Sequence, residues 1–281
     1  MTTTDGDALP DGLRPQSVMF SFLGIYVLGS GVLVSTGSVI DVMSRVGVSE
    51  EASRTTLARM ARRGLLERHR RGRQAYVGLT PRAVDVLEDG RRRVWERGAV
   101  DVAWDGSWSL VGFSLPEERR AERNAFRARL VWEGFGMLQH GLWIAPGRRD
   151  LDVVLGPLAG DRQVTTMTSR SAGVTDDREL LERAFDLDGI ARRYASFVRR
   201  WERDAVVPGL SDDLARQLVL HTDWLQVVRE TPRLPAPLLP QQPVAGQAER
   251  LFRTLAAAYE ASAAVVAAEL LDVVEPTAAG E

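Results

Sequence analysis

Arginine side chains concentrate in one short part of this 281-residue sequence. Between Ala52 and Arg73 there are eight arginines and one acidic residue, Glu67, which gives these 22 residues a net charge of +7. Guanidinium groups bind phosphate and can bind guanine bidentately, so this pattern is typical of a nucleic-acid-binding surface. Every one of the 36 basic residues is arginine. The local imbalance of charge is therefore more informative than the arginine content itself.

The rest of the sequence is balanced or acidic. Residues 1–98 hold 15 arginines and 11 acids, residues 99–203 hold 16 of each, and residues 204–281 hold 5 arginines and 11 acids. There is no cysteine, which excludes disulfides, thiolate metal sites and cysteine nucleophiles. The apolar stretch from Val18 to Leu28 is too short to span a bilayer and lacks a signal-peptide pattern, so we expect no membrane association and a cytoplasmic protein.

Three short helices are predicted around the arginine-rich segment. Apolar periodicity predicts helices from Ser17 to Leu28 and across Val39 to Val46. Ser49 is placed to cap a third helix, which ends at Gly64, a residue suited to a left-handed cap.

A hairpin and a fourth helix follow. Two predicted strands, Leu65–Arg70 and Gln74–Leu79, flank a turn at Gly72, and Thr80-Pro81 begins a polar helix that reaches about Gly98. This order predicts a winged helix-turn-helix over residues 16–98, preceded by a flexible arm over residues 1–15.

The phase of the third helix separates its faces. Ser53, Leu57 and Met60 recur at core spacing. The opposite face contains Arg54, Thr55 and Arg59, which we predict to read base edges in the major groove. Contacts to the DNA backbone are assigned to the end of this helix and to the hairpin: Arg62, Arg63, Arg68, Arg70, Arg71, Arg73 and Gln74.

The remaining two-thirds of the chain predict two further domains. Alternating strand and helix patterns between Trp104 and Thr168 give the order β-α-β-β-α-β, a ferredoxin-like middle domain over residues 99–175. Residues 176–281 predict an all-helical C-terminal domain. The fold class expected for the whole chain is therefore α+β.

Catalytic patterns are missing from the sequence. His69, His140 and His221 lie far apart and have no ligand spacing, so we expect no metal site. No phosphate-binding glycine loop, nucleophile elbow or pair of catalytic carboxylates stands out, and we predict that the protein is not an enzyme.

Several of these motifs resemble the PaaX family of bacterial repressors, which control phenylacetic acid catabolism and related pathways. The wing and the Trp-Asp-Gly stretch are the most specific parts. The matching stretches are Arg14-Pro15-Gln16-Ser17, Arg54-Thr55-Thr56-Leu57-Ala58-Arg59-Met60, Gly64-Leu65-Leu66, Arg71-Gly72-Arg73-Gln74-Ala75-Tyr76, Trp104-Asp105-Gly106-Ser107-Trp108, Pro116-Glu117-Glu118-Arg119-Arg120 and Gly141-Leu142-Trp143-Ile144.

The resemblance implies a homodimer that binds a palindromic double-stranded operator and represses an aromatic-acid or related catabolic operon. It also implies a small-molecule effector of the acyl-CoA type, phenylacetyl-CoA in the family's namesake, with no other cofactor. His221 is a candidate effector-binding residue through the resemblance alone. Arg192, Arg193 and Arg199 could receive the CoA phosphates, although such charges are more often a solvated helix face.

Two alternative functions stay open. The first is a winged-helix protein-interaction module without sequence-specific DNA binding, whose basic face serves an acidic partner. The second is a metal-dependent nuclease, because the middle domain resembles the ferredoxin-like nucleases of CRISPR adaptation. Those enzymes need an acid at the end of the first strand, where this chain has Ser114-Leu115-Pro116.

Overall fold

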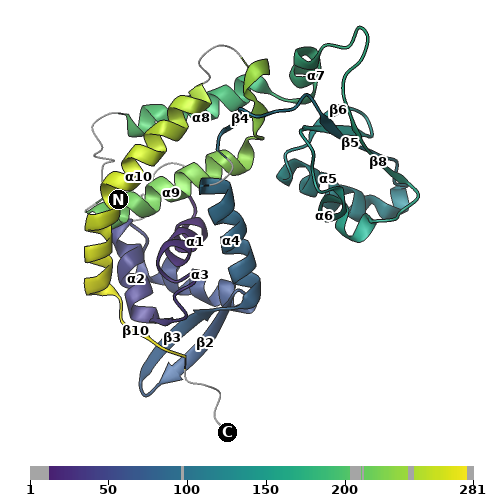
Figure 1. The fold of residues 1–281 in the computed structure, drawn as a ribbon. Coiled ribbons are helices and arrows are strands. Elements are labelled where there is room, and N and C mark those ends of the chain that lie inside the picture. Colours follow the sequence, from purple (N-terminus) through teal and green to yellow (C-terminus); the bar gives the residue numbers. More distant parts are fainter. Residues whose placement is uncertain (1–12, 96–97, 203–209, 211, 240–243, 277–281) are drawn as a thin grey trace, which may run out of the picture. The chain divides into compact units, whose positions relative to one another are not determined.

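Figure 1 shows the computed structural model, which has a mixed α+β fold. The structure describes residues 13–95, 98–202, 210, 212–239 and 244–276. The chain divides into two compact units. Unit 1 comprises residues 1–96, 199–226 and 250–281, and unit 2 comprises residues 97–198 and 227–249. Residues 176–281, predicted as one C-terminal domain, are thus divided between both units. Of the predicted arm, residues 1–12 lie outside the described residues, and Pro15 already begins a helix.

The first part of unit 1 contains the predicted helices and hairpin in the predicted order. The turn of the hairpin includes Gly72, whose φ of +58° lies in the left-handed region that favours glycine. The elements are α1 (Pro15–Tyr26), β1 (Leu33–Ser35), α2 (Thr36–Arg45), α3 (Glu50–Arg62), β2 (Leu66–Arg71), β3 (Gln74–Leu79) and α4 (Pro81–Trp95).

Serine side chains begin the two helices that lead into the arginine-rich segment. The Ser35 hydroxyl accepts a hydrogen bond from the Ser38 amide at 3.0 Å and starts α2. The Ser49 hydroxyl accepts from the Ala52 amide at 3.3 Å and starts α3, as the sequence predicts. These caps satisfy amides that have no partner within their own helix, so the start of each helix is fixed by local chemistry.

A four-stranded sheet in unit 1 has the order β10-β1-β3-β2. Its first strand, β10 (Val273–Val274), comes from the far end of the described chain and pairs antiparallel with β1. Neither β1 nor β10 is predicted from the sequence. The region after residue 176 is therefore not all-helical, since β10 and β9 (Leu234–Pro235) lie in it. Strands of two or three residues are too short to show an alternating pattern.

Two long helices complete the core of unit 1. They are α9 (Asp213–Glu230) and α10 (Val244–Leu270), of which residues 213–226 and 250–270 belong to this unit. By length and composition α10 could cross a membrane. Its buried residues, however, recur every three or four positions, at Phe252, Ala256, Tyr259, Ala263 and Ala267. That spacing is typical of a helix that packs one face against a protein core.

Unit 2 contains a second sheet with helices on both faces. Its elements are β5 (Trp108–Phe113), α5 (Arg120–Trp132), β6 (Gly136–Gln139), β7 (Leu142–Pro146), α6 (Leu151–Leu155) and β8 (Val164–Ser169), which is the predicted β-α-β-β-α-β order. The strands are arranged β6-β7-β5-β8, and all pairs are antiparallel. Along β5, Val111 and Phe113 join the core beneath α5 and α6, while Trp108 and Leu110 pack on the other face.

The second face of this sheet is covered by α7 (Asp177–Ala184), which precedes α8 (Leu187–Trp201). Leu181 of α7 is fully buried against Trp108 and Ile144 of the sheet. The Trp108 indole donates to Asp177 Oδ1 at 2.7 Å, which fixes the start of the helix. A short parallel pair, β4 (Val100–Asp101) with β9, joins the beginning of unit 2 to its later segment.

Candidate nucleic-acid interface

The α3 helix presents the face that the sequence predicts. Its core side consists of Ser53, Thr56, Leu57 and Met60, all of which are buried. The opposite side is accessible. Arg54, Thr55 and Arg62 are exposed there, and Ala58 and Arg59 are half-buried. The helix therefore turns arginine outward because its apolar residues recur at core spacing.

Two of the predicted base-reading residues differ in their surroundings. Arg54 forms an ion pair with Glu50 one turn earlier, with Nε donating to Oε1 at 2.8 Å. Both side chains are exposed, so this pair is weak and a nucleic acid could displace it. Arg59 buries its Nε atom, which has no hydrogen-bond partner among the described residues. Its apolar stem lies against the protein, as long arginine side chains often do.

The hairpin of β2 and β3 extends beyond α3. Its two strands are fully paired from Leu66↔Leu79 to Arg71↔Gln74. Tyr76 and Val77 are buried and fix β3 to the core. The arginines farther along the hairpin are solvent-exposed, namely Arg68, Arg70 and Arg73. Arg70 also donates from Nε to the carbonyl of Gly72 at 3.3 Å, which braces the turn.

Two residues predicted to bind the DNA backbone have partners within the protein. The Arg71 guanidinium donates to the main-chain carbonyl of Glu275 and is half-buried. The Gln74 side-chain carbonyl lies 2.8 Å from the Tyr76 hydroxyl. Sequence reasoning did not predict these contacts. Their roles in DNA binding stay predictions, and for both residues a contact to DNA would compete with an internal one.

Two residues outside the predicted set join the end of α3 to the start of α4. The Thr80 hydroxyl donates to the carbonyl of Gly64 at 2.8 Å, and it also accepts from the Ala83 amide as the cap of α4. Arg82 donates to the carbonyl of Arg63 at 3.0 Å. Carbonyls at the end of a helix lack partners within the helix, so these bonds stabilise the junction after α3. The Thr80-Pro81 pair was the available sequence signal.

Charge is poorly compensated on this surface. Within the described ranges, no ion pair involves the guanidinium groups of Arg62, Arg63, Arg68 or Arg73. Among the described residues of this surface, acidic contacts are made by Arg54, which pairs with Glu50, and by His69, which lies 3.7 Å from Glu67. Guanidinium groups in this state can bind phosphate without first breaking an ion pair.

The four predicted effector-binding residues are divided between the two units. His221 and Arg199 belong to unit 1, and Arg192 and Arg193 belong to unit 2. The His221 ring packs 5.6 Å from Trp95 and 5.2 Å from Phe252, between ring centroids. Burial lowers the pKa of His221 to about 4, so the ring is neutral near pH 7. Arg192 lies 4.0 Å from a carboxylate of Asp186, and Arg193 lies 3.4 Å from that of Glu230.

Unit 2 contains a cavity of about 720 Å³ beside α7 and α8. None of the four effector candidates is among the described residues that line it. Its walls are largely apolar, with Phe185 and Tyr194 among them, and the acidic residues Glu182, Asp186 and Asp188 also line it. Like charges repel, so these acidic walls do not offer the cationic partner that CoA phosphates would need.

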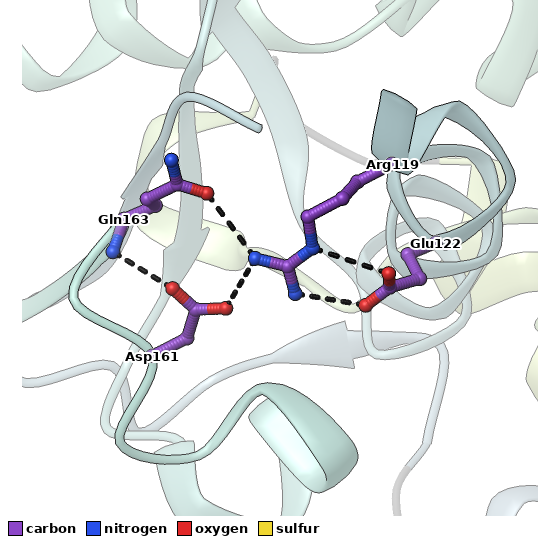
Figure 2. Close-up of polar contacts among 4 residues, drawn as sticks. All are labelled: Arg119, Glu122, Asp161 and Gln163. Atoms are coloured by element: carbon purple, nitrogen blue, oxygen red, sulfur yellow. Dashed lines mark hydrogen bonds and ion pairs between the residues drawn. The ribbon is translucent and has the colours of Figure 1, made fainter. Parts of the chain in front are cut away.

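In the middle of unit 2, Arg119 joins two segments through a polar network (Figure 2). Its guanidinium donates to Glu122 Oε2 at 2.8 Å, to Asp161 Oδ2 at 2.6 Å and to Gln163 Oε1 at 3.2 Å. The Gln163 amide and the Arg119 guanidinium, which both donate to Asp161, lower the pKa of its carboxyl. Arg119 belongs to the Pro116–Arg120 motif, and its contacts here are structural.

The end of β5 bears on the nuclease alternative. The strand ends at Phe113 and is followed by Ser114, so no carboxylate stands at the position where the nucleases have their metal-binding acid. The described part of the chain also contains no group of three or more His, Asp or Glu side chains suited to hold a metal ion.

Three family models of the same family match this chain in succession. They are a PaaX-like protein model over residues 14–83, the PaaX central Cas2-like domain over residues 101–181, and the PaaX-like C-terminal domain over residues 185–269. The chain is therefore a member of a family of transcriptional regulators. That family is the PaaX family, as the sequence motifs predict, and its functions are regulatory rather than enzymatic.

One curated relative agrees with this assignment, and one solved structure has a similar fold. The chain is 26% identical over 243 residues to the transcriptional repressor PaaX of Escherichia coli, and the match covers 80% of this chain and 73% of that protein. Among solved structures, the uncharacterized protein Rv0674 from Mycobacterium tuberculosis has a similar fold, with a TM-score of 0.62 and 22% identity. That likeness covers 90% of this chain and 98% of the other.

Proposed function

We propose that this protein is a transcriptional repressor that binds duplex DNA through a winged helix-turn-helix. In this proposal α2 and α3 are the helix-turn-helix, α3 enters the major groove, and the β2–β3 hairpin is the wing on the DNA backbone. Arg54, Thr55 and Arg59 read bases. The phosphates are held by Arg62, Arg63, Arg68, Arg70 and Arg73, while Arg71 and Gln74 contribute less because of their internal contacts.

One observation supports this proposal above the others. Six of the eight arginines that α3 and the adjacent hairpin contribute to one surface are exposed, whereas Glu67 is the single acid among residues 52–73. The unpaired positive charges of this surface attract a polyanion. Phosphate contacts also release condensed counterions, which favours binding of nucleic acid.

The wider scheme that we propose rests on what the family resemblance implies. The protein acts as a cytoplasmic homodimer on a palindromic operator of an aromatic-acid or related catabolic operon, and an acyl-CoA-type effector relieves repression. The ferredoxin-like middle region and the later helices serve dimerisation and sensing. An effector can release the operator only if it binds the two states of the repressor with different affinities.

Selection from a library of random duplexes tests the DNA-reading role. We expect enrichment of an inverted repeat, followed by binding whose log affinity falls linearly with log salt concentration. Binding without enrichment of any sequence would leave only a non-specific polyanion surface. No salt-dependent duplex binding at all would contradict the proposal and favour the protein-interaction alternative.

A second assay separates the nuclease alternative. Duplex and single-stranded DNA and RNA are incubated with the protein and Mg²⁺ or Mn²⁺, and we expect no cleavage. Metal-dependent cleavage that persists in an Arg62→Glu, Arg63→Glu variant would place an activity outside the proposed interface.

A further inference from the structure

The sheet that bears the hairpin is completed by a strand from far along the sequence. Strand β1 pairs with β3 on one side, through Val34↔Val77, and with β10 on the other, through Leu33↔Val274 and Val34↔Val273. An exposed edge strand has unpaired backbone N–H and C=O groups, and a further strand that pairs with them covers the edge. The last described strand therefore occupies what would otherwise be the free edge of this sheet.

Asp272, directly before β10, joins three elements at once. Its amide donates to the Ser38 hydroxyl at 2.9 Å, near the start of α2. Its carbonyl accepts from the Ser35 amide at 2.9 Å, at the end of β1. Its carboxylate accepts from the Tyr76 hydroxyl at 2.9 Å, in β3. Burial and the hydrogen bond to Asp272 raise the pKa of Tyr76, so the hydroxyl keeps the proton that it donates.

The same segment also reaches the outer part of the hairpin. The Glu275 carbonyl accepts a hydrogen bond from Arg71, which pairs with Gln74 next to the turn at Gly72. Residues 272–275 thus contact the hairpin at Tyr76, within the core, and at Arg71, close to its tip. Two contacts separated along β2 and β3 restrict the angle of the hairpin more than either contact does alone.

We propose that residues 272–275 are a clasp that holds the β2–β3 hairpin in register with α2 and α3, and that Asp272 is a positioning residue for DNA binding. This inference rests on the proposed function. Pairing with β1 ends at Ser35↔Tyr76, so the outer part of the hairpin is two-stranded. A two-stranded hairpin is marginally stable, and ordering it on DNA reduces affinity. The clasp orders it beforehand, so the arginines of the hairpin and of α3 meet the same duplex together.

Two shortened chains test the clasp. One lacks residues 277–281 and keeps Asp272, β10 and Glu275, and the other lacks residues 272–281. Each binds the same fluorescent duplex over a series of salt concentrations. We expect the first chain to match the full chain. The second should bind roughly tenfold more weakly, with the log–log salt slope flattened by about one to two as hairpin contacts to phosphate are lost.

Point variants guard against a general loss of folding. Asp272→Ala and Tyr76→Phe each remove the hydrogen bond between these two side chains, and Tyr76→Phe also removes the contact to Gln74. Each should weaken duplex binding several-fold, and the double variant should bind no more weakly than Tyr76→Phe alone. Asp272→Asn keeps an acceptor and should bind nearly as the unaltered chain does. Val265→Ala, at an exposed position of α10, is the matched control and should change nothing.

Amide hydrogen exchange distinguishes the clasp from the DNA-binding proposal, because it needs no DNA. Relative to the unaltered chain, Asp272→Ala should speed amide exchange across residues 66–79 and leave exchange across α1 unchanged. Unchanged exchange, together with unchanged affinity and salt slope in the chain lacking residues 272–281, would overturn the clasp while leaving DNA binding intact. Failure of the full chain to bind any duplex would instead overturn the proposed function and the role of Asp272 in it.

Discussion

Two arginine-rich surfaces of this molecule use the same side chain in opposite ways. On α3 and the hairpin, Arg62, Arg63, Arg68 and Arg73 are exposed and form no ion pair within the described residues. At the start of α5, by contrast, the arginines are paired. The pairs join Arg119 to Glu122 and Asp161, and both Arg120 and Arg123 to Glu117, at 3.7 Å and 2.7 Å respectively.

The difference lies in the acids and not in the arginines. An arginine held by two carboxylates connects parts of a fold, and a polyanion would have to displace those carboxylates first. An arginine without such partners keeps its charge available to a ligand. The local balance of charge therefore separates an interface from a structural network where arginine content cannot.

Charge reversal should expose this contrast most strongly. Arg62→Glu combined with Arg63→Glu should weaken binding to every duplex by roughly a hundredfold. The log–log salt slope is about 0.9 per phosphate contact, so each contact is worth about eightfold in affinity between 1 M and 0.1 M salt, and two contacts are lost. Fluorescence anisotropy with a random duplex measures it. Arg120→Glu on α5 is the control, and an equal loss there would erase the distinction.

A single substitution on α3 tests base reading. Arg59→Ala should cost roughly 1–3 kcal/mol on the selected operator and relax specificity at one base pair. Competition between operator and random duplex is the measurement. Equal losses on both duplexes would mean that Arg59 holds phosphate instead.

The opposite behaviour is expected at Arg119. Arg119→Ala should lower the midpoint of thermal unfolding by a few degrees and leave the affinity of folded protein for DNA unchanged. Differential scanning calorimetry beside duplex binding gives both values. A loss of affinity without a loss of stability would assign Arg119 to an interface.

Acid should act on the same network. Because the pKa of Asp161 is lowered in the folded state, the unfolded chain binds the proton more readily there. The stabilisation is therefore present above the ordinary carboxyl pKa and is lost as the pH falls through the folded value. An Asp161→Asn variant should show a weaker decline of its unfolding midpoint below about pH 5 than the unaltered chain does. A parallel decline in both would show that other groups dominate.

The smallest expected effect compares neighbours on the hairpin. Arg73→Ala should reduce the salt slope of duplex binding by about one. Arg71→Ala should reduce it by less, because Arg71 already donates to Glu275. The reverse order would mean that DNA takes Arg71 away from that carbonyl.

Local patterns made much of this fold predictable. The phase of α3, its Ser49 cap and the Gly72 turn all depend on residues within a few positions of one another, and the structure contains each of them. The partners of Arg71 and Gln74 were not predictable in this way. Glu275 lies 204 residues beyond Arg71, and two-residue β10 has no periodicity of its own.

The environment of His221 was hidden for the same reason. Its neighbours Trp95 and Phe252 come from α4 and α10, and only the fold brings the three rings together. The missing information in each case is long-range contact.

The position of β10 also constrains how the protein is made. Ser38 and Asp272 are 234 residues apart, so the sheet cannot be finished while the ribosome is still adding the intervening chain. At about 5–20 residues per second, that interval lasts roughly 10 to 50 seconds. During this time the edge of β1 is uncovered. A chain that stops before Asp272 would contain every arginine of the interface and still lack the strand that closes its sheet, so interrupted synthesis would release an unfinished sheet open to aggregation or proteolysis.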